Sequence, residues 1–196
     1  MIYDIADAKS TYGWLNYDHA KSLDYRLFFK GRKLETSGRL DYQARNESSL
    51  REVHRHHMIA SAGGPHIVSQ QLKDVIETAA PEEVEFFPAN VFFKGQKVEG
   101  YYAMNPLYRL DCVDMAKSEY KQANFDNNNP SYSFYYEVLL DEIPYGAQIS
   151  ICNEFSVQII VSQAIKNECF SRGLKGLRFC RVIDFALGDR YECETI

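Results

Sequence analysis

The chain carries one heptapeptide twice: Ile67-Val68-Ser69-Gln70-Gln71-Leu72-Lys73 returns as Ile160-Val161-Ser162-Gln163-Ala164-Ile165-Lys166. Five of the seven positions are identical, and a sixth stays apolar. Downstream, Val84-Glu85-Phe86 and Leu177-Arg178-Phe179 each begin sixteen residues after the valine of their heptapeptide. Identity combined with an equal distance to a second apolar segment predicts two copies of one unit, in which a short strand, a Ser-capped helix and a strand follow one another.

Each heptapeptide has the local chemistry of a helix N-terminus. A β-branched pair runs into Ser69 or Ser162, whose hydroxyl can accept a hydrogen bond from a free N–H in the first helical turn. The first copy then places apolar residues at helical spacing, namely Leu72, Val75, Ile76 and Ala79. The second copy keeps Ile165 and Cys169 on this stripe but has Glu168 where the first has a valine. Both serines are therefore predicted to be structural helix caps.

These units predict an α+β fold, with a mixed or antiparallel sheet flanked by two equivalent helices. At 196 residues the chain suits a single domain, 1–196. The repeat units are expected at about 66–93 and 159–183. Residues 1–60 are expected to be irregular apart from a strand at Leu27–Leu34.

Composition indicates a folded protein with a sizeable core, since 45% of the residues are hydrophobic and 25% are charged. The 22 basic and 27 acidic residues leave a net charge of -5. This charge disfavours nucleic acid as a partner and favours a basic protein.

Membrane insertion and secretion find no support in the sequence. No apolar run reaches the length of a membrane span, and the N-terminus has neither the basic nor the apolar region of a signal peptide. The five cysteines are scattered without a Cys-x-x-Cys pair, at positions Cys112, Cys152, Cys169, Cys180 and Cys193. They predict buried, reduced thiols in a cytoplasmic protein.

The segment from Lys117 to Ser133 is predicted to be an exposed loop, because it is polar and rich in asparagine. Tyr120, Phe125 and Tyr132 interrupt the polar residues. Aromatic side chains in an exposed segment are candidate anchors for a protein partner. The alternative is an ordinary surface loop.

Catalytic and metal-binding motifs are weak. His54, His56 and His57 are the one candidate metal cluster, with His66 further on, but their spacing lacks the convergence of a zinc site. Nucleophile elbows and phosphate loops are absent. The carboxylates Glu82-Glu83, Asp111 and Asp114 are interpreted as surface charge or local hydrogen bonding. The sequence thus predicts no active site, no metal and no cofactor.

An ordered set of motifs resembles immunity family eleven of bacterial polymorphic toxin systems. In chain order the motifs are Phe28-Phe29-Lys30-Gly31-Arg32, Gly63-Gly64, Ile67-Val68-Ser69, Tyr101-Tyr102-Ala103-Met104-Asn105-Pro106, Asp111-Cys112-Val113-Asp114 with Ser118, and Ile160-Val161-Ser162. Gly176-Leu177-Arg178-Phe179 looks like the family's Gly-(Val/Leu)-x-Phe strand. The likeness extends from about Phe28 to Val182. It departs from the family at Asn153-Glu154-Phe155-Ser156, where the family has an Ile-Phe-Arg step.

The resemblance implies a cytoplasmic, non-enzymatic protein that binds a cognate toxin, delivered in many such systems by contact-dependent or type VI secretion. It implies no set of toxin-binding residues. Two alternatives stay open: a metal-dependent enzyme or metalloprotein that uses His54, His56 and His57, and a regulatory binding module unrelated to toxins.

Overall fold

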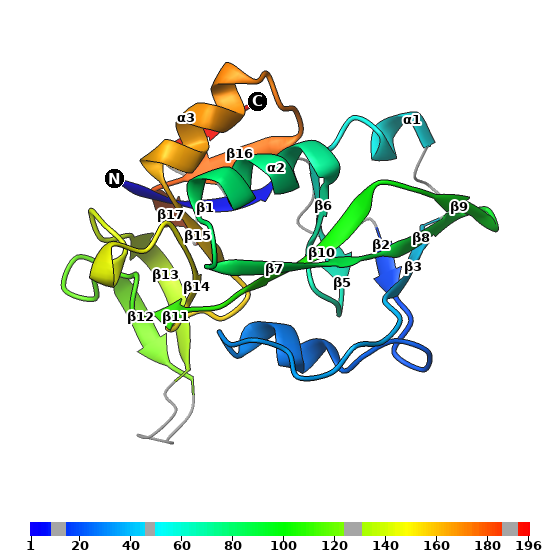
Figure 1. Ribbon diagram of the computed structural model, residues 1–196. Helices are drawn as coiled ribbons and strands as arrows, with labels where there is room; N and C mark the ends of the chain where they lie inside the picture. Colours follow the sequence, from blue (N-terminus) through cyan, green and yellow to red (C-terminus); the bar gives the residue numbers. More distant parts are fainter. Residues whose placement is uncertain (9–14, 46–49, 124–130, 186–191) are drawn as a thin grey trace.

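The computed structural model describes residues 1–8, 15–45, 50–123, 131–185 and 192–196. Over these residues the protein is mostly β, with four mixed or antiparallel sheets and two helices of more than two turns (Figure 1). Figure 1 shows these two helices, α2 and α3, side by side, with β1 below them.

The first sheet is built around the N-terminal strand. Its strands, in spatial order, are β11 (Arg109–Leu110), β14 (Ile149–Cys152), β15 (Ile159–Ser162), β1 (Ile2–Asp7), β16 (Leu177–Cys180) and β18 (Cys193–Thr195). β1 pairs antiparallel with both β15 and β16, so that Ile5 stands between Ile159 and Phe179. All three side chains are buried, which makes β1 a core strand.

The second sheet is antiparallel throughout and lies next to the first. Its order is β4 (Met58–Ile59), β6 (Ile67–Ser69), β10 (Tyr101–Pro106) and β7 (Val84–Pro88). Pro88 forms the last pair of the edge strand β7, opposite Tyr102. A proline fits this position because an edge strand needs fewer backbone donors.

The third sheet gathers segments from the first half of the chain. Its order is β5 (Ser61–Ala62), β2 (Leu15–Tyr17), β3 (Asp41–Ala44), β8 (Asn90–Phe93) and β9 (Gln96–Val98). The prediction that residues 1–60 are irregular is therefore wrong, because β1, β2 and β3 lie in this range.

The predicted strand at Leu27–Leu34 is also wrong, because the chain forms the 3-10 helix η1 (Tyr25–Phe29) there. Asp24 caps it by accepting a hydrogen bond from the Arg26 N–H at 3.0 Å. Phe28 then points into the core and meets the ring of Phe87 edge-on. Local capping thus overrides the strand propensity of the apolar run.

The fourth sheet is formed by β12 (Glu119–Gln122), β13 (Tyr132–Val138) and β17 (Val182–Asp184), all antiparallel. The predicted loop at Lys117–Ser133 is wrong at its ends, since β12 and the start of β13 occupy them. Figure 1 shows β12 and β13 at the lower left, on the side away from the short helix α1 (Leu50–Val53).

The predicted helices and caps are confirmed. α2 (Gln70–Ala79) and α3 (Gln163–Ser171) begin directly after their serines. Ser69 Oγ accepts from the Leu72 N–H at 3.3 Å, and Ser162 Oγ accepts from the Ile165 N–H at 3.4 Å. The apolar stripe of α2 is buried at Leu72, Val75 and Ile76, and that of α3 at Ile165 and Cys169.

The two strand–helix–strand units have the same local topology. In the first, β6 and β7 flank β10 and pair antiparallel with it on both sides. In the second, β15 and β16 flank β1 in the same manner. The helices pack on one shared core, which contains Leu72, Ile76, Ile165 and Cys169. In the first unit the central strand follows the helix in the chain, whereas in the second it precedes it.

Gly176 shows why the second unit needs glycine before its closing strand. Its φ of +75° lies in the left-handed region, and a Cβ there would stand 2.6 Å from His56 Nδ1. The close approach of the His56 ring thus depends on the missing side chain.

The prediction of five reduced cysteines is wrong for two of them. Cys180 and Cys193 form a disulfide, because β16 and β18 pair in a register that sets these residues opposite each other. Cys112, Cys152 and Cys169 are free and buried, as expected. Among the described residues, no helix is long and apolar enough to cross a membrane.

Candidate partner-binding face

Two of the three predicted anchors come together on the β12–β13 hairpin. Tyr120 lies opposite Phe134 in the register, and its ring meets that of Tyr132 edge-on, with centroids 5.3 Å apart. Phe125, the third predicted anchor, falls outside the described residues. The hairpin therefore joins Tyr120 and Tyr132 into one aromatic pair, whose role as a contact surface stays a prediction.

The pair is one end of a longer series of ring contacts. We define the aromatic ladder as Tyr120, Tyr132, Phe134, Phe155 and Phe185. The distances between ring centroids are 6.1 Å from Tyr132 to Phe134 and 6.5 Å from Phe134 to Phe155. The centroids of Phe155 and Phe185 are 6.3 Å apart. Edge-on and tilted arrangements at these distances are favourable for aromatic rings.

Exposure divides the aromatic ladder into an inner and an outer part. Phe134 is buried among core residues, whereas Tyr120 and Phe185 keep 42% and 38% of their surface exposed. The inner ring fixes the position of the outer ones, and the outer rings remain available to a partner. Large, rigid and partly exposed aromatics of this kind are typical anchors of protein interfaces.

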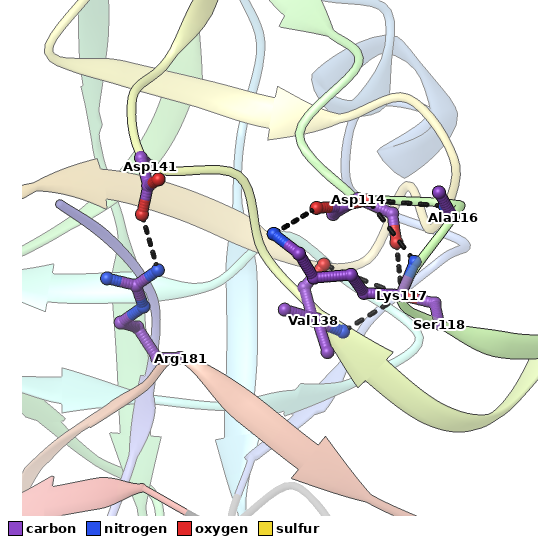
Figure 2. A network of polar contacts seen from close by, with 7 residues as sticks. All are labelled: Asp114, Ala116, Lys117, Ser118, Val138, Asp141 and Arg181. Atoms are coloured by element: carbon purple, nitrogen blue, oxygen red, sulfur yellow. Dashed lines mark hydrogen bonds and ion pairs between the residues drawn. The ribbon is translucent and has the colours of Figure 1, made fainter.

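A polar network fixes the base of the hairpin (Figure 2). Asp114 Oδ1 accepts from the Ala116 and Lys117 N–H groups, each at 3.2 Å, and its Oδ2 lies 2.7 Å from Lys117 Nζ. These contacts hold the pKa of Asp114 below its usual value, the Lys117 side chain being the main cause. Ser118 Oγ donates to the Asp114 carbonyl and accepts from the Val138 N–H on β13.

The same side of the hairpin carries a second ion pair. Arg181 reaches Asp141 at 2.7 Å, which lowers the pKa of that carboxyl. Figure 2 shows the Asp141 and Arg181 side chains directed toward each other, beside the contacts of Asp114 with Lys117. In each pair one side chain is exposed, Lys117 or Asp141, and the other is partly covered, so that solvent screens both pairs and they contribute little to stability. The Arg181–Asp141 pair joins the segment after β13 to the residue before β17.

Glu154 anchors the segment that carries Phe155. Its carboxylate accepts from the N–H groups of Cys112 and Val113 at 3.1 and 3.3 Å, and it is 8% exposed. Asp111 accepts from the Asn153 side chain at 2.6 Å. Glu83 likewise accepts from the Gln148 N–H at 2.7 Å. Local hydrogen bonding, as predicted, is seen at Asp114, whereas Asp111 and Glu83 accept from residues far away in the chain.

The histidines do not converge. His56 Nδ1 lies 3.2 Å from Asp7 Oδ1, while His57 Nδ1 bonds Ser69 Oγ at 2.8 Å and His54 is exposed. Within the described part of the chain, no three His, Cys, Asp or Glu side chains are grouped to hold a metal ion. The geometry therefore does not favour the metal-dependent alternative.

The free thiols are poorly suited to nucleophilic chemistry. Burial raises the pKa of Cys112 and of Cys169 to about 12, and it raises that of Cys152 further. A thiol in such surroundings stays protonated at neutral pH and is a weak nucleophile. These cysteines act as small apolar core residues.

Sequence reasoning missed Phe155 and Phe185. Neither stands near Tyr120 in the chain, and each is a single aromatic among mixed neighbours. Phe155 follows β14 and Phe185 follows β17, so that their contact depends on the packing of segments far apart in the chain, which a short-range pattern does not reveal. The nearest signal is the pair of apolar side chains at Phe155 and Val157 in an otherwise polar segment.

Comparison with known proteins adds one match. The model of a family described as "Immunity protein family (Imm11)" matches residues 21–184. This range agrees with the span from Phe28 to Val182 over which the motifs show their resemblance. A search of curated proteins finds no match to the sequence.

Proposed function

The chain belongs to the Imm11 immunity protein family, and from this premise we propose that it binds a cognate toxin protein and neutralises it by covering the toxin's active site. Family membership over most of the chain is the observation that carries the proposal. Proteins of this kind are typically non-enzymatic binders, so the proposal includes no catalytic role.

The aromatic ladder is the surface that we assign to the toxin. Tyr120 and Phe185 offer exposed rings on a rigid three-strand base, and burial of such rings provides most of the energy in many interfaces. The net charge of -5 favours a basic toxin surface, since opposite charges speed the encounter of two proteins.

The proposed architecture has two parts. Residues 1–196 form one domain, and its two strand–helix–strand units are copies of an internal repeat. The equal placement of Ser69 and Ser162, and of β10 and β1 between their flanking strands, supports the repeat. A single cooperative unfolding transition by two independent probes would support one domain, and two separated transitions would contradict it.

We propose the cytoplasm of the producing bacterium as the site of action, and type VI or contact-dependent secretion as the route of the toxin. The Cys180–Cys193 pair offers a direct test of the location, because disulfides persist in oxidising compartments and are rare in the cytoplasm. Because Cys180 is buried, the cells are quenched in acid and the protein is unfolded in alkylating reagent without reductant; alkylation of both thiols then supports the cytoplasm. A protected disulfide places the protein outside it.

Co-expression tests the function. The toxin encoded beside this chain is produced in a susceptible strain, with and without the immunity protein. Survival restored by the wild-type chain, together with a stable one-to-one complex of the purified proteins, is the expected result. A toxin that kills equally in both strains and does not bind the chain contradicts the proposal.

A further inference from the structure

Three turns of the chain meet at Glu83, which lies between α2 and β7. Its main-chain carbonyl accepts from the Leu107 N–H, in the turn between β10 and β11, at 2.8 Å. Its carboxylate Oε2 accepts from the N–H groups of Gln148 and Ile149 at 2.7 and 3.1 Å. These two residues follow closely on the 3-10 helix η2 (Pro144–Gly146). One glutamate thus ties the three turns together.

A hollow of about 200 Å³ lies between these turns. We define the tyrosine hollow by its lining residues, which are Glu83, Tyr108, Leu110, Tyr145, Gly146 and Ala147. Ala147 is buried in the core cluster that also contains Phe134 of the aromatic ladder, and Leu110 packs against that cluster. Tyr108 and Tyr145 are 44% and 95% exposed. The tyrosine hollow therefore combines an apolar base with two exposed aromatic side chains.

Tyr145 has an unusual backbone for its residue type. Its φ of +62° and ψ of 14° lie in the left-handed region, which disfavours side chains other than those of asparagine and aspartate. Because the residue is 95% exposed, its side chain gains almost no packing from its own fold in return. A strained residue that does not stabilise the fold indicates a role in function. An exposed tyrosine suits binding, since its rigid ring offers a large contact area at low entropic cost.

Charge at the tyrosine hollow favours a basic partner. Glu83 lines the hollow, and Glu82 precedes it on the same turn and is exposed. Neither takes part in the ion pairs formed among the described residues. The basic residue next to Tyr108 is Arg109, whose guanidinium donates to the Asn153 carbonyl at 3.1 Å. A second copy of this chain is a poor occupant, because each copy carries a net charge of -5.

We propose that the tyrosine hollow is a second contact surface for the toxin, and that it receives an apolar toxin side chain flanked by lysine or arginine. This inference rests on the proposed function and names the chemistry of one contact. The apolar side chain lies against Leu110 and Ala147, and the flanking cations meet the two glutamates and the tyrosine rings. Pockets for drug-sized ligands measure about 300–1,000 Å³, so a hollow of about 200 Å³ suits a single side chain.

Substitution of Tyr145 separates binding from folding. Tyr145→Asn should weaken toxin binding at least about tenfold, the effect expected for an aromatic anchor. The melting temperature should stay the same or rise, because asparagine tolerates the left-handed region better than tyrosine. Lys94→Asn is the matched control, since Lys94 is exposed and has a φ of +47° in the turn between β8 and β9. Its toxin affinity should stay within about twofold of wild type.

Reversal of one charge tests the flanking cations. Glu82→Lys should weaken toxin binding about fivefold or more at low salt, and the loss should shrink at about 1 M salt, where charges are screened beyond about 3 Å. Glu99→Lys makes the same change in net charge beside β9, where the Glu99 side chain is 76% exposed. Figure 1 shows β9 and β11 on opposite sides of the molecule, so this control should change the affinity little.

A peptide probe tests the tyrosine hollow without the toxin. The acetylated and amidated tripeptide lysine-leucine-lysine is titrated into the labelled protein, and the amide signals of Leu110 and Ala147 are followed by NMR. We expect saturable shifts with this peptide, clearly weaker binding of lysine-glycine-lysine, and no shifts with glutamate-leucine-glutamate. Tyr145→Asn should weaken the binding of the first peptide. Shifts that are absent, or as large with the acidic peptide, overturn the proposal.

The toxin and peptide experiments separate the two claims. If the wild-type chain binds the toxin and Tyr145→Asn binds it as tightly as Lys94→Asn does, the inference fails and the proposed function stands. If Glu82→Lys binds the toxin more tightly than wild type, the partner is acidic at this surface and the inference fails. If the wild-type chain does not bind the toxin, the proposed function fails and the toxin contact with it. The peptide titration then still decides whether the tyrosine hollow takes an apolar side chain between two cations.

Discussion

Ser69 Oγ lies 2.8 Å from His57 Nδ1 while it accepts the Leu72 N–H. One hydroxyl thus caps α2 and also ties it to the segment before β4. For Ser162 the corresponding hydroxyl has the capping bond to Ile165. The two caps are equivalent in position but differ in what they connect.

This difference predicts unequal costs of removing the two caps. Ser162→Ala should lower the free energy of unfolding by about 1 kcal/mol, the usual cost of losing an N-cap. Ser69→Ala should cost about 1 kcal/mol more, because a second hydrogen bond is lost. Urea denaturation measures both, and Ser69→Thr serves as the control that keeps the hydroxyl. Equal costs for the two alanine variants would show that the His57 contact adds nothing.

Removal of the aromatic pair Tyr120 and Tyr132 is expected to lower the affinity for the toxin. Tyr120→Ala combined with Tyr132→Ala should weaken the complex by about 2 kcal/mol or more, the size expected for an interface hot spot. Tyr135→Ala tests the opposite face of the same strand, where Tyr135 is 51% exposed and its carbonyl accepts from the Phe185 N–H. Calorimetric titration measures the affinities. A larger effect at Tyr135 would move the binding face to the other side of the sheet.

The predicted anchor Phe125 is tested by extending the same experiment. Adding Phe125→Ala to the double variant completes the set proposed from the sequence. A further loss of affinity supports its role as the third anchor, and an unchanged affinity removes it from the surface.

The disulfide predicts a redox-dependent stability. Cys180 and Cys193 are 13 residues apart, and closing a loop of about this length stabilises a protein by about 3 kcal/mol in the chain-entropy treatment. Reduction should therefore lower the melting temperature of the wild type, while a Cys180→Ala, Cys193→Ala variant should not respond to reductant. The buried Cys112 and Cys169 should resist alkylation until the protein unfolds. A wild type that melts at the same temperature with and without reductant would contradict the prediction.

Two histidines predict that mild acid destabilises the fold. Burial lowers the pKa values of His57 and His66 below their usual 6.5, with His56 adding to the effect at His57. The unfolded chain then binds more protons than the folded one as the pH falls through about 6.5. The free energy of unfolding is thus highest above that pH and decreases below it. The carboxylates with lowered pKa values, such as Asp114, add their own loss only at lower pH.

The measurement is a series of urea denaturations between about pH 7.5 and pH 5, the window in which histidines titrate and carboxylates do not. His66→Gln removes one of the two groups and should flatten the dependence. A stability that rises toward pH 5 would contradict the assignment.

Much of the secondary structure near the repeats could be predicted because its causes are local. A serine before an apolar stripe carries its own cap, and both helices begin where Ser69 and Ser162 indicate. The segment around Phe28 misled the prediction, because its apolar letters resemble a strand while the Asp24 cap starts a 3-10 helix. A competing local hydrogen bond decided that case.

The sequence by itself determined the Ser-capped units, the apolar stripes of their helices and the family, because these depend on residues a few positions apart. Only the tertiary structure decided that Tyr120 and Phe185 belong to one ladder and that Cys180 faces Cys193. The physical reason is strand register: pairing between segments far apart in the chain sets which side chains meet, and no short pattern encodes that alignment.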